Sequence, residues 1–150
     1  MSTRKLSIII LWSLLSGTVR AETNPLHWKG HEKLAGHIGD GLVTVQITKG
    51  FIDAYREHNL KCWAARNGMG LAINEILKRT ITRNRPDNSD NKSFPSMHTM
   101  LGTVNARGWS YSLSATIALS RMGANKHYFT DVAGGFGLGL LSQKVCNDKE

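Results

Sequence analysis

Cysteine, proline and aromatic residues are all scarce in this chain: its 150 residues include 2 cysteines, 3 prolines and 7% aromatics. So few cysteines exclude a small disulfide-rich scaffold and a zinc site made of four thiolates. After residue 21 the sequence also lacks an apolar run of the roughly 18 residues that a membrane-spanning helix requires. The length fits one domain, and no internal repeat or low-complexity tract divides it.

Acidic residues are few as well, since 11 Asp and Glu stand against 19 Lys and Arg and leave a net charge of +8. The first 21 residues contribute to this excess and have the pattern of a signal peptide: Arg4 and Lys5, an apolar stretch over 6–19, and small residues before Glu22. We expect cleavage after Ala21, export, and a periplasmic domain over residues 22–150. The alternative is an uncleaved segment that keeps the protein at a membrane.

Loss of Arg4, Lys5 and Arg20 with the signal peptide removes three of the positive charges and leaves +5. This balance favours anionic partners: a phosphorylated small molecule or a lipid headgroup, with peripheral contact to a membrane surface. Nucleic acid is not expected as a partner, because the sequence has no basic stripe interleaved with aromatic residues.

The two cysteines, Cys62 and Cys146, are predicted to form a disulfide, because their number is even and an exported protein can keep such a bond. The alternative is a pair of buried thiols. A bridge would join the C-terminal tail to the first half of the domain.

Apolar residues recur at helical spacing over residues 42–56, 62–83, 96–106, 110–120 and 129–143. The first of these segments begins with β-branched residues, so a strand is the alternative there. Residues 22–40, with Pro25 and several glycines, are predicted to be irregular, and residues 87–94 to form a polar loop. The predicted fold class is therefore all-α, a compact helical bundle in a single domain.

A first block of chemically suggestive residues is the cluster of Lys78, Arg79, Arg83 and Arg85 before Pro86. Lys78 and Arg85 are two helical turns apart, so a helix that continues to Pro86 would turn both side chains to one face. Such a face suits a phosphate dianion, for which lysine offers a point charge and arginine a fork of donors. The alternative is an ordinary solvated basic surface.

A second block, Pro95-Ser96-Met97-His98, opens the predicted helix over 96–106. Ser96 is a good N-cap, and the backbone N–H groups of a helix N-terminus point toward an anion. The Ser96 hydroxyl and the amides of Met97 and His98 would then line an oxyanion site, with the His98 ring at its rim. The alternative is a helix cap beside a surface histidine.

The third block runs from Ser120-Arg121 to His127 and Asp131. His127 and Asp131 are four residues apart, so a helix or a turn brings them together. A carboxylate that accepts a hydrogen bond from one ring nitrogen fixes the histidine tautomer and leaves the other nitrogen free to attack phosphorus. A surface ion pair is the alternative. No metal site is expected, because no third ligand lies nearby in the sequence.

These three blocks resemble the type 2 phosphatidic acid phosphatase (PAP2) superfamily, especially its exported bacterial members. Lysine, six residues and Arg-Pro match residues 78–86, and Ser-Arg, five residues, histidine, three residues and aspartate match residues 120–131. The family's Pro-Ser-Gly-His matches residues 95–98, except that Met97 replaces glycine. The resemblance extends over residues 39–142.

The resemblance implies a helical bundle of the PAP2, acid phosphatase and haloperoxidase type that hydrolyses phosphomonoesters without metal or cofactor. His127 would form a phosphohistidine, Asp131 would orient it, and His98 would protonate the leaving alcohol and then activate water. The groups that would hold the phosphoryl oxygens are Lys78, Arg85, Ser96, the amide of Met97 and Arg121.

Two departures from the family pattern leave alternatives open. Met97 places a Cβ where glycine lets an anion approach closely, and the segments over 86–95 and 98–120 are shorter than is usual in the family. They motivate the alternative to an active phosphatase, a catalytically impaired remnant that binds phosphate or an anionic lipid headgroup. A vanadium-dependent haloperoxidase, which uses a related constellation, is the other enzymatic alternative.

Overall fold

The computed structural model describes residues 24–146, so the predicted signal peptide over residues 1–21 lies outside the described residues. Within the described range the helices are α2 (Glu32–Arg56), α3 (Leu60–Thr80), α4 (Met97–Val104), α5 (Tyr111–Gly123) and α6 (Phe129–Gln143), with a short 3-10 helix, η1 (Gly108–Ser110), before α5. The predicted all-α class is confirmed. None of the described helices is both long and apolar enough to cross a membrane.

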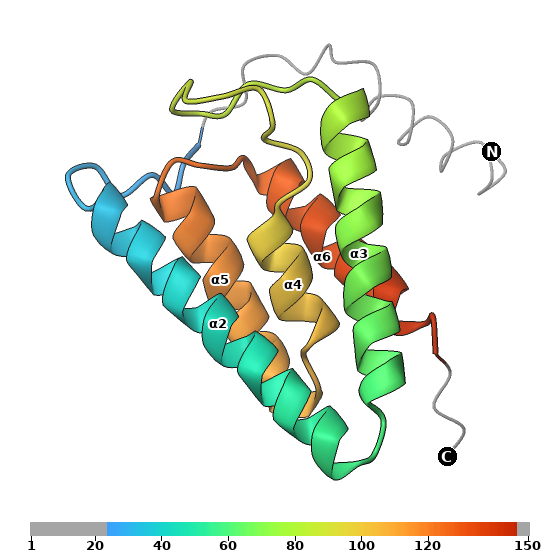
Figure 1. Ribbon diagram of the computed structural model, residues 1–150. Coiled ribbons are helices and arrows are strands. Elements are labelled where there is room, and N and C mark those ends of the chain that lie inside the picture. The colour runs from blue at the N-terminus through green and yellow to red at the C-terminus, as the bar shows by residue number, and fades with distance from the viewer. Residues whose placement is uncertain (1–23, 147–150) are drawn as a thin grey trace, which may run out of the picture.

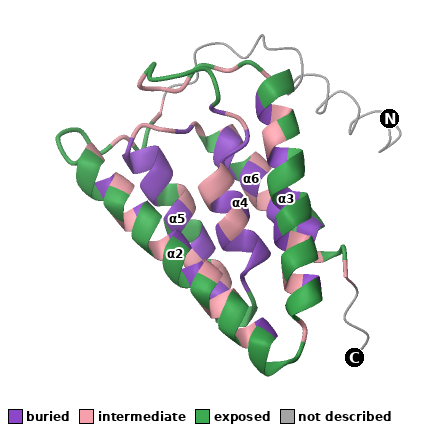
Figure 2. Cartoon of the chain, viewed as in Figure 1, coloured by how far each residue is buried: buried purple, intermediate pink, exposed green. Residues whose placement is uncertain are grey.

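The short helix α4 occupies the middle of the bundle, with α2 and α5 on one side and α3 and α6 on the other (Figure 1). An isolated helix of this length is unstable in water, so contacts with its four neighbours must hold it in place. Most of its surface is buried (Figure 2), and Met100 and Val104 form the apolar core together with Leu138 of α6. The position of α4 therefore depends on tertiary contacts.

Helix α2 begins at Glu32, so the prediction of irregular structure over residues 22–40 is wrong from residue 32 onward. Two of the glycines that suggested a break, Gly36 and Gly39, are contact points between helices. A Cβ atom on Gly39 would lie 2.5 Å from Ser120 Oγ of α5, and one on Gly36 would touch Ala124. Close helix contact offsets the low helix propensity of these residues.

Helix α3 ends at Thr80 rather than near Arg83, and residues 81–96 form a loop between α3 and α4. An isolated β-bridge between Arg83 and Lys92 closes this loop on itself. Lys78 and Arg85 therefore do not share a helix face as predicted. The folded-back loop, and not a continuous helix, determines where Arg85 lies.

The predicted disulfide between Cys62 and Cys146 is wrong, because both residues are thiols in the structure. Cys62 is buried in the first turn of α3, whereas Cys146 follows α6 and accepts a hydrogen bond at its carbonyl from Arg66 at 3.1 Å. The backbone of Cys146 is thus held beside a residue one turn farther along α3 than Cys62. An even number of cysteines carries no information about how the end of α6 is aligned along α3.

Glycines on one face of α6 bring that helix into close contact with α4. A Cβ atom on Gly139 would lie 2.5 Å from Thr103 Cβ and 2.8 Å from the carbonyl oxygen of Met100. Gly137 has no atom within 4 Å of the corresponding position. Gly139 therefore permits close contact between α6 and α4, whereas Gly137 of the same helix does not.

Gly139→Ala is expected to destabilise the protein by about 1–3 kcal/mol, because the added methyl group has to displace α4. Gly137→Ala is the matched control and should be neutral or stabilise by about 0.5–1 kcal/mol through its higher helix propensity. Urea unfolding followed by circular dichroism measures both free energies. Equal effects of the two substitutions would contradict the close contact between α4 and α6.

Candidate functional site

The three sequence blocks meet at one end of the bundle, the upper end in Figure 1. The C-terminal ends of α3 and α5 bring Lys78 and Arg121 there, and the N-terminal ends of α4 and α6 bring Ser96 and His127. The cations of the three blocks and the N-terminal N–H groups of α4 and α6 favour an anion at this end, although the C-terminal ends of α3 and α5 oppose this effect. The fold thus gathers residues that are far apart in the sequence.

Asp131 is completely buried and is surrounded by donors. Its Oδ1 accepts a hydrogen bond from Arg83 at 2.7 Å, and its Oδ2 accepts one from the backbone N–H of Tyr128 at 2.9 Å and another from the Ser93 hydroxyl. Burial alone would raise the pKa of Asp131, but the neighbouring His127 and Ser93 and the charge of Arg83 lower it overall. Asp131 is therefore an ionised carboxylate with a fixed orientation.

His127 is buried between Asp131 and Arg85. Its Nδ1 lies 3.7 Å from Asp131 Oδ2, and its Nε2 lies 3.5 Å from a guanidinium nitrogen of Arg85. Burial, with the charges of Arg85 and Lys78, lowers the pKa of His127, so the ring is neutral at pH 7. Because a guanidinium only donates, Nε2 is the unprotonated nitrogen and Nδ1–H faces the carboxylate. This tautomer is the one that a nucleophilic histidine needs.

Lys78 and Arg121 are buried cations that lack full compensation in the free protein. Lys78 donates to the carbonyl of Lys92 at 2.7 Å, and burial together with the charge of Arg85 lowers its pKa to about 8. Burial also lowers the pKa of Arg121, with Arg85 adding to the effect, and the Nε of Arg121 has no hydrogen-bond partner. An anion placed among these groups would stabilise all of them.

His98 faces Asp40, a residue of α2 that the sequence blocks did not include. Asp40 Oδ1 lies 2.9 Å from His98 Nε2 and 3.0 Å from a guanidinium nitrogen of Arg121. The carboxylate accepts, so Nε2 of His98 carries a proton. Burial and then the charge of Arg121 lower the pKa of His98 to about 4, although Asp40 opposes both effects. A bound anion beside this ring would raise its pKa again.

Ser96 holds the predicted N-cap position of α4, but its side chain makes no capping hydrogen bond. Its hydroxyl accepts from Thr99 Oγ1 at 3.1 Å, and its backbone N–H donates to the carbonyl of Asp131 at 3.0 Å. The Met97 side chain packs against the apolar core around Met100. The extra bulk relative to glycine is thereby accommodated in the core, and the first N–H groups of α4 have no partner within the helix.

Three residues of the site were missed by sequence reasoning: Asp40, Arg83 and Ser93. Arg83 holds Asp131 and lies 4.5 Å from the ring centre of Tyr128. Asp40 was assigned to an irregular segment, and Arg83 was one cation among four. Asp40 reaches the site because α2 begins at Glu32, and Arg83 reaches Asp131 because of the path of the loop after α3. No local sequence pattern indicates either feature. Nothing in the sequence distinguishes Ser93 from the other polar residues of that loop.

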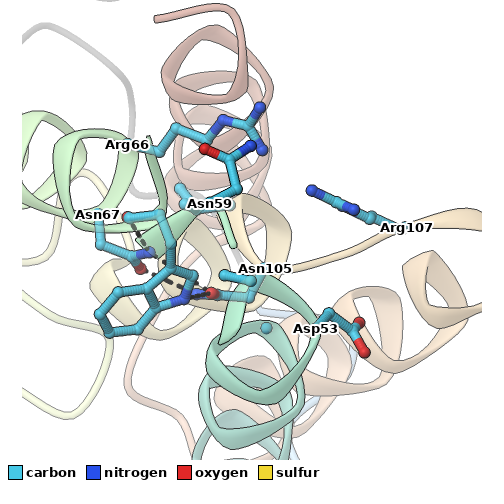
Figure 3. A pocket seen from close by; sticks show the side chains of 10 residues that line it. Asp53, Asn59, Arg66, Asn67, Asn105 and Arg107 are labelled. Atoms are coloured by element: carbon cyan, nitrogen blue, oxygen red, sulfur yellow. Dashed lines mark hydrogen bonds between the residues drawn. The ribbon is translucent and has the colours of Figure 1, made fainter. Parts of the chain in front are cut away.

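A second polar cavity lies at the opposite end of the bundle, where Asn67 and Asn105 face each other (Figure 3). Asn105 donates to Asn67 Oδ1 at 2.9 Å, and the Trp63 indole donates to Asn105 Oδ1 at 2.8 Å. The cavity measures about 20 Å³, which is room for one or two water molecules. This hydrogen-bond network joins α3 to the end of α4. The cavity beside it is too small to be a substrate site.

Comparisons with protein-family models, with curated proteins and with solved structures give no match to this chain. Among residues 24–146, no group of three His, Cys, Asp or Glu side chains is placed to hold a metal ion. The described site offers a neutral buried imidazole, a second imidazole with a proton on its outer nitrogen, and several cations. These groups are suited to bind a tetrahedral oxyanion and to attack it.

The affinity for inorganic phosphate is expected to decrease above pH 8. The pKa of Lys78 in the free protein is about 8, so the ammonium group loses its proton there and its attraction for the anion. The slope should approach a tenfold loss per pH unit. Isothermal titration calorimetry from pH 7 to 9 measures it.

Lys78→Met should bind phosphate more weakly at pH 7 and lose the decrease above pH 8. Arg79→Gln is the control, because the Arg79 side chain is 76% exposed and pairs with Glu75. A decrease that persists in Lys78→Met would show that another group causes it.

Proposed function

We propose that this chain is a metal-independent phosphatase that hydrolyses phosphomonoesters through a phosphohistidine, with the helical fold and chemistry of the PAP2 superfamily. The observation that carries the proposal is the placement of His127, whose Nδ1 faces the buried Asp131 and whose Nε2 faces Arg85 among the cations. The matching spacing of the three sequence blocks supports the family assignment.

In the first step, Nε2 of His127 attacks the phosphorus atom, and the bond from phosphorus to the alcohol oxygen breaks. Protonated His98 gives its Nε2 proton to the departing oxygen, which leaves as a neutral alcohol. Lys78, Arg85 and Arg121 stabilise the negative charge on the phosphoryl oxygens. The products are the alcohol, neutral His98 and a phosphohistidine at His127.

In the second step, neutral His98 removes a proton from a water molecule, and the resulting hydroxide attacks phosphorus. The bond between phosphorus and Nε2 breaks, so inorganic phosphate leaves and His127 regains its lone pair. His98 ends this step protonated, ready for the next ester. Asp131 stabilises the positive charge that His127 acquires while its Nε2 is bonded to phosphorus.

Substrate binding prepares both histidines for this chemistry. The dianionic phosphoryl group raises the pKa of His98 from its low value in the free site, so that the ring can act as an acid. It also competes with Nε2 of His127 for the Arg85 guanidinium. The distance of 3.7 Å between Nδ1 and Asp131 exceeds a hydrogen bond, and such contacts commonly shorten when substrate binds.

The substrates of this proposal are a small soluble phosphomonoester, a lipid phosphate or a lipid pyrophosphate. The net charge of +8 is consistent with any of these anions. A signal peptide over residues 1–21 would place the reaction outside the cytoplasm, in the periplasm, as the sequence pattern predicts.

His127→Ala is expected to reduce phosphate release from p-nitrophenyl phosphate by about a thousandfold or more, because the nucleophile is removed. Turnover should not require added metal and should continue in the presence of a chelator. Acid-stable protein phosphorylation is not expected, since a phosphohistidine is labile in acid and survives in alkali. A quenched-flow experiment with labelled substrate measures both turnover and the intermediate.

His58→Asn is the control for this substitution. His58 is exposed at the turn between α2 and α3, and its positive φ of 54° is one that asparagine tolerates. Unchanged turnover in His127→Ala would refute the mechanism. A folded wild-type protein that binds phosphate but turns over no ester would support the alternative of a phosphate-binding remnant.

Arg83→Gln is expected to lower kcat by about 10- to 100-fold, because Asp131 loses a charge-assisted hydrogen bond inside the protein. KM should change little, since Arg83 positions Asp131 and does not hold the substrate. Arg83→Lys should restore part of the rate. Arg79→Gln is the matched control. If this variant lowered kcat as much as Arg83→Gln does, the loss of one positive charge, and not the contact with Asp131, would explain the effect.

A further inference from the structure

A charged cavity of about 550 Å³ opens beside the candidate site. It lies between the first half of α2 and the loop that joins α5 to α6, and its size is within the range of small-molecule pockets. Asp40 and Arg121 line it. These two residues contact each other, and Asp40 also contacts His98 in the phosphate site. The cavity and the phosphate site are therefore adjacent and share a wall.

The cavity lies on the side from which the alcohol of a phosphomonoester would leave. In an in-line displacement the leaving oxygen is opposite the attacking nitrogen and next to the group that protonates it. In the proposed mechanism that group is His98, whose Nε2 is 2.9 Å from Asp40 in the free protein. The leaving oxygen would replace the Asp40 oxygen at this nitrogen, and the rest of the alcohol would extend into the cavity that Asp40 lines.

The walls of the cavity combine apolar surface, to which Gly36 and Ala124 contribute, with charges of both signs. Glu32 and Asp87 are acceptors, Lys33 and Lys126 are donors, and His37 offers a further polar nitrogen. Lys126 already pairs with Asp87 at 2.5 Å. Hydroxyl groups, which both donate and accept, match such a surface. Glu32 is likewise paired, with His27 at 2.8 Å. The groups that an acyl chain would remove from water without offering a hydrogen bond are therefore mainly Lys33 and His37, and burying them in this way is costly.

The wall opposite α2 is held in place by contacts outside the phosphate site. Asn24 donates to the carbonyl of Met122 at 2.7 Å and to Asn125 Oδ1 at 3.0 Å. The backbone N–H of Trp28 donates to the carbonyl of Gly123 at 3.0 Å, and a Cβ on Gly123 would lie 2.8 Å from the Trp28 ring. The cavity is thus formed before any ligand binds.

An apolar groove of about 390 Å³ exists as well, but it lies between α3 and α6. Leu77 and Leu138 are among its lining residues. Figure 1 shows these helices on the side of α4 away from α2 and α5. Neither His98 nor Asp40 lines that groove.

We propose that the charged cavity binds the alcohol portion of the substrate, and that this alcohol is a compact polyol or sugar rather than a diacylglycerol. The inference rests on the proposed function, because it takes the direction of the leaving group from the role of His98. Lys33 and His37 are the residues that determine specificity, since they line the cavity and lie outside the three sequence blocks.

Binding of uncleavable analogues tests the inference without relying on turnover. The probes are methylphosphonate, the phosphonate analogue of glucose 6-phosphate and the phosphonate analogue of dihexanoyl phosphatidate, titrated calorimetrically into the full chain at 150 mM salt. The sugar analogue is expected to bind about tenfold more tightly than methylphosphonate, as a few hydrogen bonds would provide. The double variant Lys33→Gln/His37→Gln should lose this preference and keep its affinity for methylphosphonate within about twofold, since salt screens the removed charge.

Lys29→Gln/His31→Gln is the matched control, because both residues are exposed next to the start of α2 and neither lines the cavity. This variant should keep the preference for the sugar analogue. Tighter binding of the phosphatidate analogue, or no preference for the sugar over methylphosphonate, would overturn the inference. A sugar preference without His127-dependent turnover would support the cavity and refute the phosphatase, so the two failures are distinguishable.

Discussion

The buried carboxylate of Asp131 connects the loop after α3 with His127 and the start of α6. An ionised carboxylate is buried only where donors replace its water, because an unpaired charge in the interior is very costly. Here Arg83 and Ser93, both from the loop after α3, supply donors, while the backbone carbonyl of Asp131 accepts the N–H of Ser96. One residue of α6 thereby holds the loop and the start of α4 and faces His127. Among the cations of that loop, Arg83 is held by this buried charge, whereas Arg85 pairs with Asp90 at 2.7 Å.

The free site is electrostatically incomplete. Burial lowers the pKa of Lys78 to about 8 and that of His98 to about 4, and in both cases a neighbouring arginine adds to the shift. The folded protein therefore holds these protons less tightly than the unfolded chain. This costs stability where the unfolded chain is protonated, at neutral pH for Lys78 and only in acid for His98. A bound dianion would reverse these pKa shifts. Such a site trades stability for affinity, as functional sites commonly do.

The helical scaffold permits this arrangement because small residues allow close contacts at its centre. Gly39 lets α2 approach α5, and Gly139 lets α6 approach the backbone of α4. Helix α4 is too short to be stable alone, so its N-terminus at Ser96 is directed toward the site only by its neighbours. At the other end of α4, the hydrogen bonds between Asn67 and Asn105 fix it to α3. The bundle is thus polar at both ends, but the buried cations Lys78 and Arg121 lie at the end that carries the candidate site.

The sequence by itself determined most of the helices and the local geometry of the third block. Helical periodicity located α6 at residues 129–143, and the four-residue spacing correctly brought His127 near Asp131, since both features depend on residues close in the chain. The structure also brings the blocks that carry Lys78 and Ser96 to the same end of the bundle. The family resemblance, and not helical periodicity, suggested that these blocks lie together.

Only the tertiary structure decided the rest, because it depends on contacts between distant segments. Glycines that read as helix breaks in residues 32–40 serve helix contact, so α2 and its Asp40 were missed. Arg83 became the partner of Asp131 through a loop whose path no local pattern specifies. The register between α3 and the end of α6 keeps Cys62 and Cys146 as thiols. Local propensity acts over a few residues, whereas the site is assembled from residues as far apart in the sequence as Asp40 and Asp131.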